Sequence, residues 1–346
     1  MKTEDRQQIL RITVDEVEQA LPHQESDRTL RPQTTSYGRV AQSAASRATP
    51  ETSTIFFHSW FYLGSAGLLG SLAAWAIAEP GFVDGAADQW GNIWLMPMVV
   101  SLMCVGLAIA ESLIERSRLK ALRRAGLSLA LGMVFGLLLH RVATAIYHVG
   151  LQLCGEEALK AISPSVWIAR GVAWAVFGIA GGIVYGIVGQ SAKKTAYGVL
   201  GGALGAALGG VIFDPISFVT HGGAPSRAVG FCLLGLSTGA AIGLVESALK
   251  NRWLYVTAGP LAGKQFILYK AETTVGSNQD CDIHLFKDAD IEPDHAVLQQ
   301  RASRLYLQAN GPVYVSGQKV HGEQVLKNGQ DVQIGRYRFC YQEKER

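Results

Sequence analysis

Charged residues are scarce in this chain. Asp, Glu, Lys and Arg make up 17% of its 346 residues, against about 25% in ordinary soluble proteins. The stretch 196–213, AYGVLGGALGAALGGVIF, contains no charged residue at all. A net charge of +3 is too small to indicate a nucleic-acid partner. The composition therefore predicts an integral membrane protein that binds no nucleic acid.

Paired cysteines and catalytic motifs are also missing. The five cysteines stand singly, without a Cys-x-x-Cys pair, so neither a disulfide framework nor a zinc site is indicated. The first fifty residues are polar, so no cleavable signal peptide is expected. GPLAGKQ at 259–265 is one residue too short for a phosphate-binding loop and leads into a predicted strand. We therefore expect no enzyme activity, no cofactor and no metal.

The chain contains six long hydrophobic segments. Each is close to the roughly 20 residues that cross a 30 Å hydrocarbon core. Glycines weaken helices in water, but in a bilayer the helix still forms and its glycines let neighbouring helices approach closely. We predict an all-α six-helix transmembrane bundle over residues 54–250, and the same glycine-lined faces leave a homo-oligomer open. The predicted spans are 55–78, 93–110, 127–147, 166–188, 196–219 and 228–249.

Basic residues alternate from one connection to the next. The N-terminal tail holds seven Lys and Arg, and the connection after the second span holds five more, between 116 and 124. Lys193 and Lys194 follow the fourth span, and Lys250 and Arg252 follow the sixth, whereas the other three connections hold only Lys160 and Arg227. Basic residues stay on the cytoplasmic side. Both termini are therefore expected in the cytoplasm, with the bundle in the lipid bilayer of a bacterial cytoplasmic membrane.

The tail, residues 1–53, divides into two parts. Apolar residues recur at helical spacing from Leu10 to Leu21 and stop at Pro22. They indicate a short amphipathic helix, either marginal or docked on a partner or on the protein's own soluble domain. Residues 23–53 are typical of disorder. Tail threonines on the cytoplasmic side suggest that the tail docks on the C-terminal domain; they are Thr34, Thr35, Thr49, Thr52 and Thr54.

Charged residues inside the spans are the usual candidates for a transport path. His140, Arg141 and Arg170 lie toward the outer side, and Asp214 lies late in the fifth span. Either arginine could pair with Asp214, or the arginines could extend to the interface in a purely structural role. Two further carboxylates, Glu111 and Glu246, stand beside basic residues at the cytoplasmic ends and are expected to be interfacial.

The pattern changes after the sixth span. From Leu254 onward, short runs of alternating apolar and polar residues are separated by Gly, Asn and Asp. This spacing predicts an antiparallel all-β sandwich of about 90 residues within 251–346. The expected strands are 254–257, 265–269, 273–275, 282–285, 295–299, 304–307, 313–315, 331–334 and 338–341.

Motifs in this region follow one another in a recognisable order. They are GKQFIL from Gly263, TTVGS ending at Ser277, CDIHL from Cys281, DADIEPDHAVL ending at Leu298, YVSGQKV from Tyr314 and LKNGQDVQIG ending at Gly335. In order and spacing, residues 252–343 resemble the forkhead-associated (FHA) domain. The resemblance implies an eleven-stranded β-sandwich whose loops at one end recognise phosphothreonine peptides. It covers a little over a quarter of the chain and names no family for the bundle.

The peptide-binding positions that the resemblance implies are only partly kept. The glycine and histidine that shape the family's loops stand as Gly276 and His295. The arginine position is Ser277 and the serine position is Glu292. For the family's Asn-Gly pair the sequence match gives Ser316 and Gly317. The replaced positions are those that touch phosphate or peptide in the family.

These replacements weaken a phosphate site. A phosphate carries nearly two negative charges and is best held by the planar fork of an arginine. Glu292 would repel it by about 4 kcal/mol for unit charges at about 4 Å and an effective dielectric of about 20. Three basic residues, Lys264, Lys287 and Arg301, would compensate only if the loops brought them inward. Phosphothreonine binding, recognition of an unmodified protein surface, and a structural role all stay open.

Together these features predict a membrane adaptor that displays an FHA-like domain to a cytoplasmic protein or peptide, phosphorylated or not. The competing function is a channel or transporter regulated by that domain. The sequence does not identify the partner, the oligomeric state or the process served.

Overall fold

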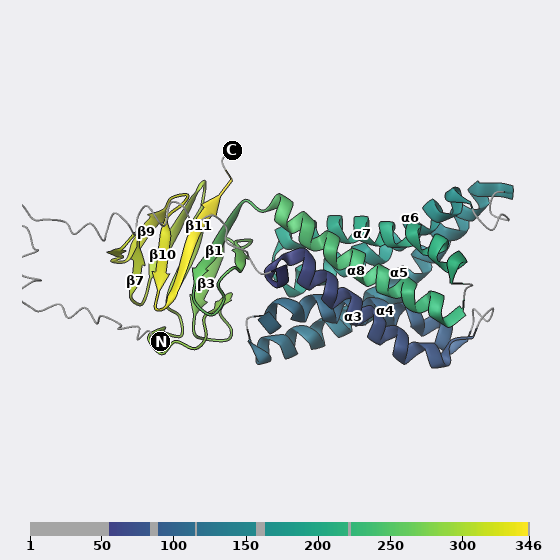
Figure 1. The fold of residues 1–346 in the computed structure, drawn as a ribbon, viewed down its shortest axis with the longest axis horizontal. Coiled ribbons are helices and arrows are strands. Elements are labelled where there is room, and N and C mark those ends of the chain that lie inside the picture. Colours follow the sequence, from purple (N-terminus) through teal and green to yellow (C-terminus); the bar gives the residue numbers. More distant parts are fainter. Residues whose placement is uncertain (1–54, 84–88, 115, 157–162, 221–222, 345–346) are drawn as a thin grey trace, which may run out of the picture. The chain divides into compact units, whose positions relative to one another are not determined.

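The computed structural model describes residues 55–83, 89–114, 116–156, 163–220 and 223–344, all within one compact unit. Six helices in this part of the chain are long and apolar enough to cross a membrane, judged by length and composition. Two short 3-10 helices, η1 (Ile55–Phe57) and η2 (Glu79–Gly81), flank the first. The six are α3 (Ser59–Ala78), α4 (Trp90–Ile114), α5 (Arg118–Cys154), α6 (Pro164–Val188), α7 (Ala192–Val219) and α8 (Gly223–Leu249) (Figure 1).

Each predicted hydrophobic segment forms a helix, but α5 is much longer than predicted. It begins at Arg118 rather than near Leu127 and runs for 37 residues. Hydropathy marks only the apolar part of a helix, whereas Arg, Lys, Leu and Ala are all good helix formers. The basic residues assigned to a connection therefore include Lys120, Arg123 and Arg124 on the first turns of α5.

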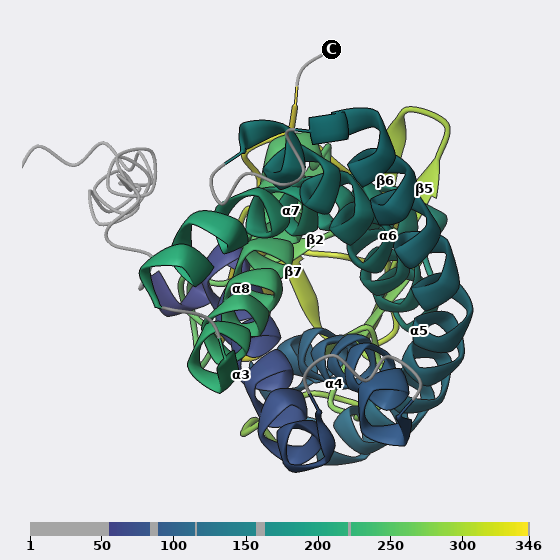
Figure 2. The ribbon, with the colours of Figure 1, turned by 90° about the vertical axis from the view of Figure 1, so that its right-hand side faces the viewer.

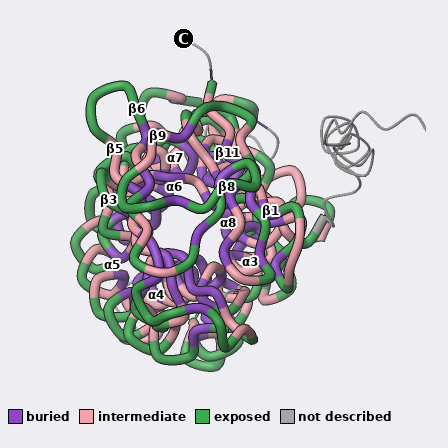
Figure 3. Tube along the Cα trace, turned by 90° about the vertical axis from the view of Figure 1, so that its left-hand side faces the viewer, coloured by how far each residue is buried: buried purple, intermediate pink, exposed green. Residues whose placement is uncertain are grey.

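The helices form a ring in which each packs against its neighbours in sequence, and α3 closes the ring against α8 (Figure 2). Exposed positions recur along the outer turns of α5, whereas in α4 only Trp90 and Leu113 are exposed (Figure 3). Glycines lie at the closest approaches. A Cβ at Gly178 of α6 would lie 1.9 Å from the carbonyl oxygen of Gly202 in α7, and one at Gly67 of α3 would lie 2.2 Å from that of Gly235 in α8. The predicted glycine packing is confirmed.

The chain after α8 forms two β-sheets. One has the order β2-β1-β11-β10-β7-β8 and the other β4-β3-β5-β6-β9. Side chains alternate between core and surface, and Tyr337, Phe339 and Tyr341 of the last strand are fully buried. The strands are β1 (Arg252–Ala258), β2 (Gln265–Ile267), β3 (Glu272–Gly276), β4 (Ile283–His284), β5 (Ala296–Arg301), β6 (Arg304–Ala309), β7 (Val313–Val315), β8 (Gln318–Lys319), β9 (Glu323–Leu326), β10 (Asp331–Ile334) and β11 (Tyr337–Glu343).

The predicted fold class, six apolar helices followed by an all-β sandwich, is confirmed. The resemblance implied eleven strands, and the two sheets contain six and five. Pattern reading missed β8, whose two residues are both exposed, and β9, which has one buried residue among four. Such short strands lack the alternation of buried and exposed positions that identifies a strand in a sequence. The predicted amphipathic helix and the tail threonines lie outside the described residues.

Candidate functional site

The loops at one end of the sandwich are built around His295, which is completely buried. Its Nδ1 accepts the backbone N–H of Glu292 at 3.0 Å, so the ring proton is on Nε2, which donates to the carbonyl oxygen of Pro312 at 3.1 Å. The backbone N–H of His295 donates to Val275 at the end of β3. One imidazole thus connects the loop before β5 to the loop before β7, and His295 is architectural.

The same end of the sandwich shows why glycine stands at 276. A Cβ there would lie 1.9 Å from the carbonyl oxygen of Pro293. This close approach lets the backbone N–H of Ser277 donate to Glu292 at 3.0 Å and that of Asn278 donate to Pro293 at 3.2 Å. The chain thereby places Ser277 beside Glu292, which is exposed.

The predicted pair Ser316 and Gly317 is not part of these loops. Both have positive φ, 50° and 82°, and form the two-residue turn between β7 and β8, as a type I′ hairpin requires. The Asn-Gly pair that contacts His295 is instead Asn310 and Gly311, whose backbone N–H groups both donate to the His295 carbonyl oxygen. The Asn310 amide also donates to the carbonyl oxygen of Asp294 at 3.1 Å. Sequence reasoning missed this pair, although Asn-Gly is a turn signal.

The sequence offered Lys264, Lys287 and Arg301 as cations that could compensate for the missing arginine. Among the described contacts, none joins them to Ser277 or Glu292. Lys264 is buried at a different cavity, which Glu111 also lines. Arg301 pairs with Glu323 at 2.9 Å. Lys287 is exposed, with a φ of 63°. Ser277 and Glu292 lie side by side at this end of the sandwich, joined by the hydrogen bond from the Ser277 N–H to the Glu292 carbonyl oxygen.

Cys281 ties the loop after β3 to the loop before β5. Its thiol donates to the carbonyl oxygen of Pro293 at 3.2 Å. Burial raises the pKa of Cys281 to about 11, so the thiol stays protonated at neutral pH. The protonated thiol is the form that donates this hydrogen bond between the two loops.

The helical bundle itself holds the loop that follows Ser277. Lys120 of α5 donates to the carbonyl oxygen of Cys281 at 2.9 Å, and Arg123 pairs with Asp280 at 3.0 Å. The Ser117 hydroxyl, just before α5, donates to the carbonyl oxygen of Gln279 at 3.3 Å. The loop that follows Ser277 is therefore held by the chain's own bundle.

Among the charged residues of the spans, the structure pairs Arg170 with Asp214 at 2.8 Å. Arg170 also donates to the Tyr147 hydroxyl at 2.8 Å. His140 lines a cavity of about 140 Å³ with these two side chains, whereas Arg141 is exposed on α5. Arg170, and not Arg141, is thus the arginine that pairs with Asp214. Its bonds to Asp214 and Tyr147 satisfy its charge between the helices.

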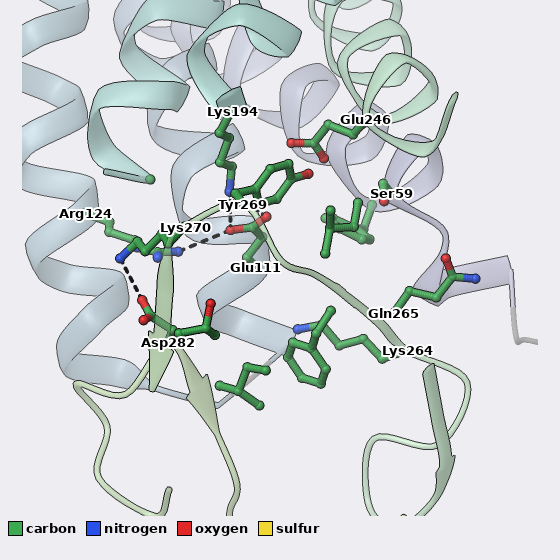
Figure 4. A pocket seen from close by; sticks show the side chains of 16 residues that line it. Ser59, Glu111, Arg124, Lys194, Glu246, Lys264, Gln265, Tyr269, Lys270 and Asp282 are labelled. Carbon is green, nitrogen blue, oxygen red and sulfur yellow. Dashed lines mark hydrogen bonds and ion pairs between the residues drawn. The ribbon is translucent and has the colours of Figure 1, made fainter. Parts of the chain in front are cut away.

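A second charged cluster joins four helices and was missed from the sequence. Lys194 of α7, only 5% exposed, donates to both carboxylate oxygens of Glu111 of α4 at 2.7 Å. The Tyr185 hydroxyl of α6 donates to the same carboxylate at 3.1 Å, and Arg124 of α5 approaches it at 3.4 Å. The buried Glu246 lies nearby (Figure 4). Residues this far apart in sequence carry no common pattern, so only the fold identifies the cluster.

Comparisons with known proteins agree with the fold of the last ninety residues. The family model described as inner membrane component of T3SS, cytoplasmic domain, matches residues 255–345. The glycogen accumulation regulator GarA of Mycolicibacterium smegmatis is 31% identical over 106 residues, which are 30% of this chain and 66% of the relative. GarA of Mycobacterium tuberculosis H37Rv is 34% identical over 91 residues, 25% of this chain and 55% of the relative. The chain thus spans about half to two thirds of these relatives.

Solved structures of FHA domains are also similar to about a quarter of this chain. The FHA domain of CT664 from Chlamydia trachomatis is 26% identical, with a TM-score of 0.26 over 28% of this chain and 100% of that one. The FhaA FHA domain, solved with the intracellular domain of Rv3910, is 17% identical, with a TM-score of 0.24 over 26% of this chain and 99% of that one.

The class of protein follows from these observations. The C-terminal region is an FHA-like domain, confirming the resemblance found in the sequence. It is attached to six helices apolar enough to cross a membrane. The protein is a membrane protein that presents an FHA-like domain, and the part matched by the family model corresponds to a cytoplasmic domain.

Proposed function

We propose that this protein is a membrane-anchored adaptor whose FHA-like domain binds a cytoplasmic protein without requiring phosphothreonine. The observation that carries this proposal is the composition of the loop end. His295 and Gly276 keep the loops in place, but the position for a phosphate-binding arginine is Ser277 and the neighbouring Glu292 is exposed. The matched family, a cytoplasmic domain of an inner membrane component of T3SS, supports a structural role in a membrane assembly and no catalytic one.

The contact with the bundle adds to this proposal. Lys120 and Arg123 of α5 bind the loop that follows Ser277, which leaves a peptide fewer free polar groups on that side. A partner that binds another part of the FHA-like domain, without a phosphate group, does not need this loop to be free. Loops that recognise partners while a rigid scaffold positions them are common in proteins.

The phosphate dependence can be measured on the full-length protein in lipid nanodiscs. Phosphothreonine peptides and their unmodified counterparts are titrated in parallel, and we expect the two series to differ by less than about threefold. Ser277→Arg combined with Glu292→Ser should raise affinity for the phosphorylated series by about 10- to 100-fold, since hydrogen bonds to charged groups contribute about 1.5–3 kcal/mol.

The matched control is Gln318→Arg with Glu272→Ser. It makes the same change in net charge at exposed strand positions and should leave the affinity unchanged. Micromolar binding by the unaltered protein that disappears without the phosphate group would contradict the proposal.

We propose further that all six helices span the membrane and that both termini are cytoplasmic. On this proposal the tail is 1–53, the membrane domain 54–250 and the FHA-like domain 251–346. The support is the alternation of basic residues between connections. In a cysteine-free background, Ala224→Cys at the start of α8 should react in intact cells with a maleimide that cannot cross membranes. Lys344→Cys should react only after permeabilisation, and the reverse result would overturn this orientation.

A further inference from the structure

A cavity of about 400 Å³ lies where α7 begins, α8 ends and the sandwich starts. Four basic side chains line it and only one acidic side chain, so it carries an excess of positive charge. These charged residues are Lys193, Lys250, Arg252, Lys344 and Glu343. None of its lining residues belongs to the loops around His295, and it shares Ile267 and Tyr269 with the neighbouring cavity that Glu111 lines.

Glu343, the one carboxylate among the described residues that line this cavity, is already engaged. Glu343 accepts from Arg252 at 3.1 Å and from the Tyr341 hydroxyl at 2.6 Å. Two of the three lysines, Lys250 and Lys344, contact neutral groups instead. Lys250 donates to the side-chain oxygen of Gln265 and lies 4.3 Å from the centre of the Trp253 ring, while Lys344 donates to the carbonyl oxygen of Ala248.

This arrangement is electrostatically unbalanced. Burial, together with the nearby charge of Lys344, lowers the pKa of Lys250. The side chains are therefore placed for a bound anion, which would relieve the repulsion between them. Phosphate groups are the common biological anions that lysine and arginine bind by charge-assisted hydrogen bonds.

An exposed apolar stripe leads away from this cavity along α7. Lys193 and Tyr197 line the cavity, and Leu200, Leu204 and Leu208 continue the same helical face at a spacing of three or four residues. These leucines are 47%, 57% and 56% exposed. On the proposed topology α7 crosses the bilayer, so acyl chains would cover this stripe directly beside the cavity.

We propose that this cavity binds the phosphate headgroup of an anionic phospholipid whose acyl chains lie along Leu200, Leu204 and Leu208. Tyr197 stands between the polar and apolar parts, where aromatic residues are enriched in membrane proteins. Basic pockets at the cytoplasmic ends of membrane helices bind anionic headgroups in this way. Because the cavity is lined by residues of α7 and of the sandwich, the lipid would also hold the FHA-like domain on the bundle.

The proposal can be tested with delipidated full-length protein in neutral detergent. Phosphatidylglycerol, phosphatidylcholine and inorganic phosphate are added separately, and lipid retention is measured by native mass spectrometry alongside thermal unfolding. We expect phosphatidylglycerol to bind about tenfold more tightly than phosphatidylcholine and to raise the unfolding temperature. Lys193→Gln with Lys344→Gln should remove most of that preference, because each lysine near a headgroup contributes appreciably.

Lys319→Gln with Lys327→Gln is the matched control. It removes the same charge from exposed positions of the sandwich and should keep the preference. Equal binding of the two lipids, or an equal loss of the preference in the control, would overturn the proposal. Protection by millimolar inorganic phosphate that depends on Lys193 and Lys344 would overturn it too, by assigning the cavity to a soluble phosphate. None of these results depends on the phosphopeptide titration, so the two proposals can fail separately.

Discussion

Lys194→Met is expected to lower the free energy of unfolding by about 2–3 kcal/mol, less than the cost of about 3–5 kcal/mol for a buried charge left without any partner, because Arg124 still pairs with Glu111. The Lys194 ammonium is the nearest cation to Glu111, at 2.7 Å from both oxygens. After its removal the carboxylate keeps the Tyr185 hydroxyl at 3.1 Å and Arg124 at 3.4 Å. The Tyr185 hydroxyl carries no charge and Arg124 is farther away, so together they stabilise the carboxylate less than Lys194 does.

The loss should be reversed in part when Glu111→Gln is added, because the carboxylate charge is then removed and only Arg124, whose side chain is 19% exposed, loses its partner. Unfolding is followed by circular dichroism in one fixed lipid or detergent. Arg123→Met is the control: it also breaks an ion pair, but its partners are 65% and 58% exposed, so a change of about 0–1 kcal/mol is expected. Equal stability of Lys194→Met and Arg123→Met would show that the Lys194–Glu111 ion pair contributes no more to stability than an exposed one.

The second large effect is expected at the contact between α6 and α7. A Cβ at Gly182 would lie 2.2 Å from the Gly198 carbonyl group, well inside van der Waals contact with backbone that cannot rotate away. Gly182→Leu should therefore destabilise the bundle by about 3 kcal/mol, the upper end of the cost of overpacking. Membrane helices depend on such close approach because water does not drive their association.

Gly126→Leu in α5 is the matched control, since nothing lies within 4 Å of a Cβ at that position. It should be neutral or slightly stabilising, because leucine is the better helix former. The measurement is unfolding of purified protein in mixed micelles with increasing denaturing detergent. If the two leucine variants unfolded together, close packing at Gly182 would not contribute to the stability of the bundle.

Sequence reasoning succeeded where a feature repeats locally. Six long apolar segments predict six helices because the bilayer admits few other backbone structures, and alternating runs predict most strands of the sandwich. It failed at the start of α5, because charged residues can continue a helix beyond its hydrophobic part. It also assigned the family's Asn-Gly pair to Ser316 and Gly317, where the structure places Asn310 and Gly311 against His295. Two similar turns a few residues apart cannot be distinguished until their contacts are known.

The sequence by itself determined the class of protein: hydrophobic length specified the membrane part, and ordered motifs specified the FHA-like domain. Only the tertiary structure decided which charges meet. It paired Glu111 with Lys194, gave Asp214 to Arg170 rather than to Arg141, and gathered Lys193, Lys250 and Lys344 around one cavity. The physical reason is the distance along the chain over which each feature is set. Hydropathy and strand alternation are properties of neighbouring residues, whereas ion pairs and cavities depend on side chains that folding brings together from distant parts of the chain.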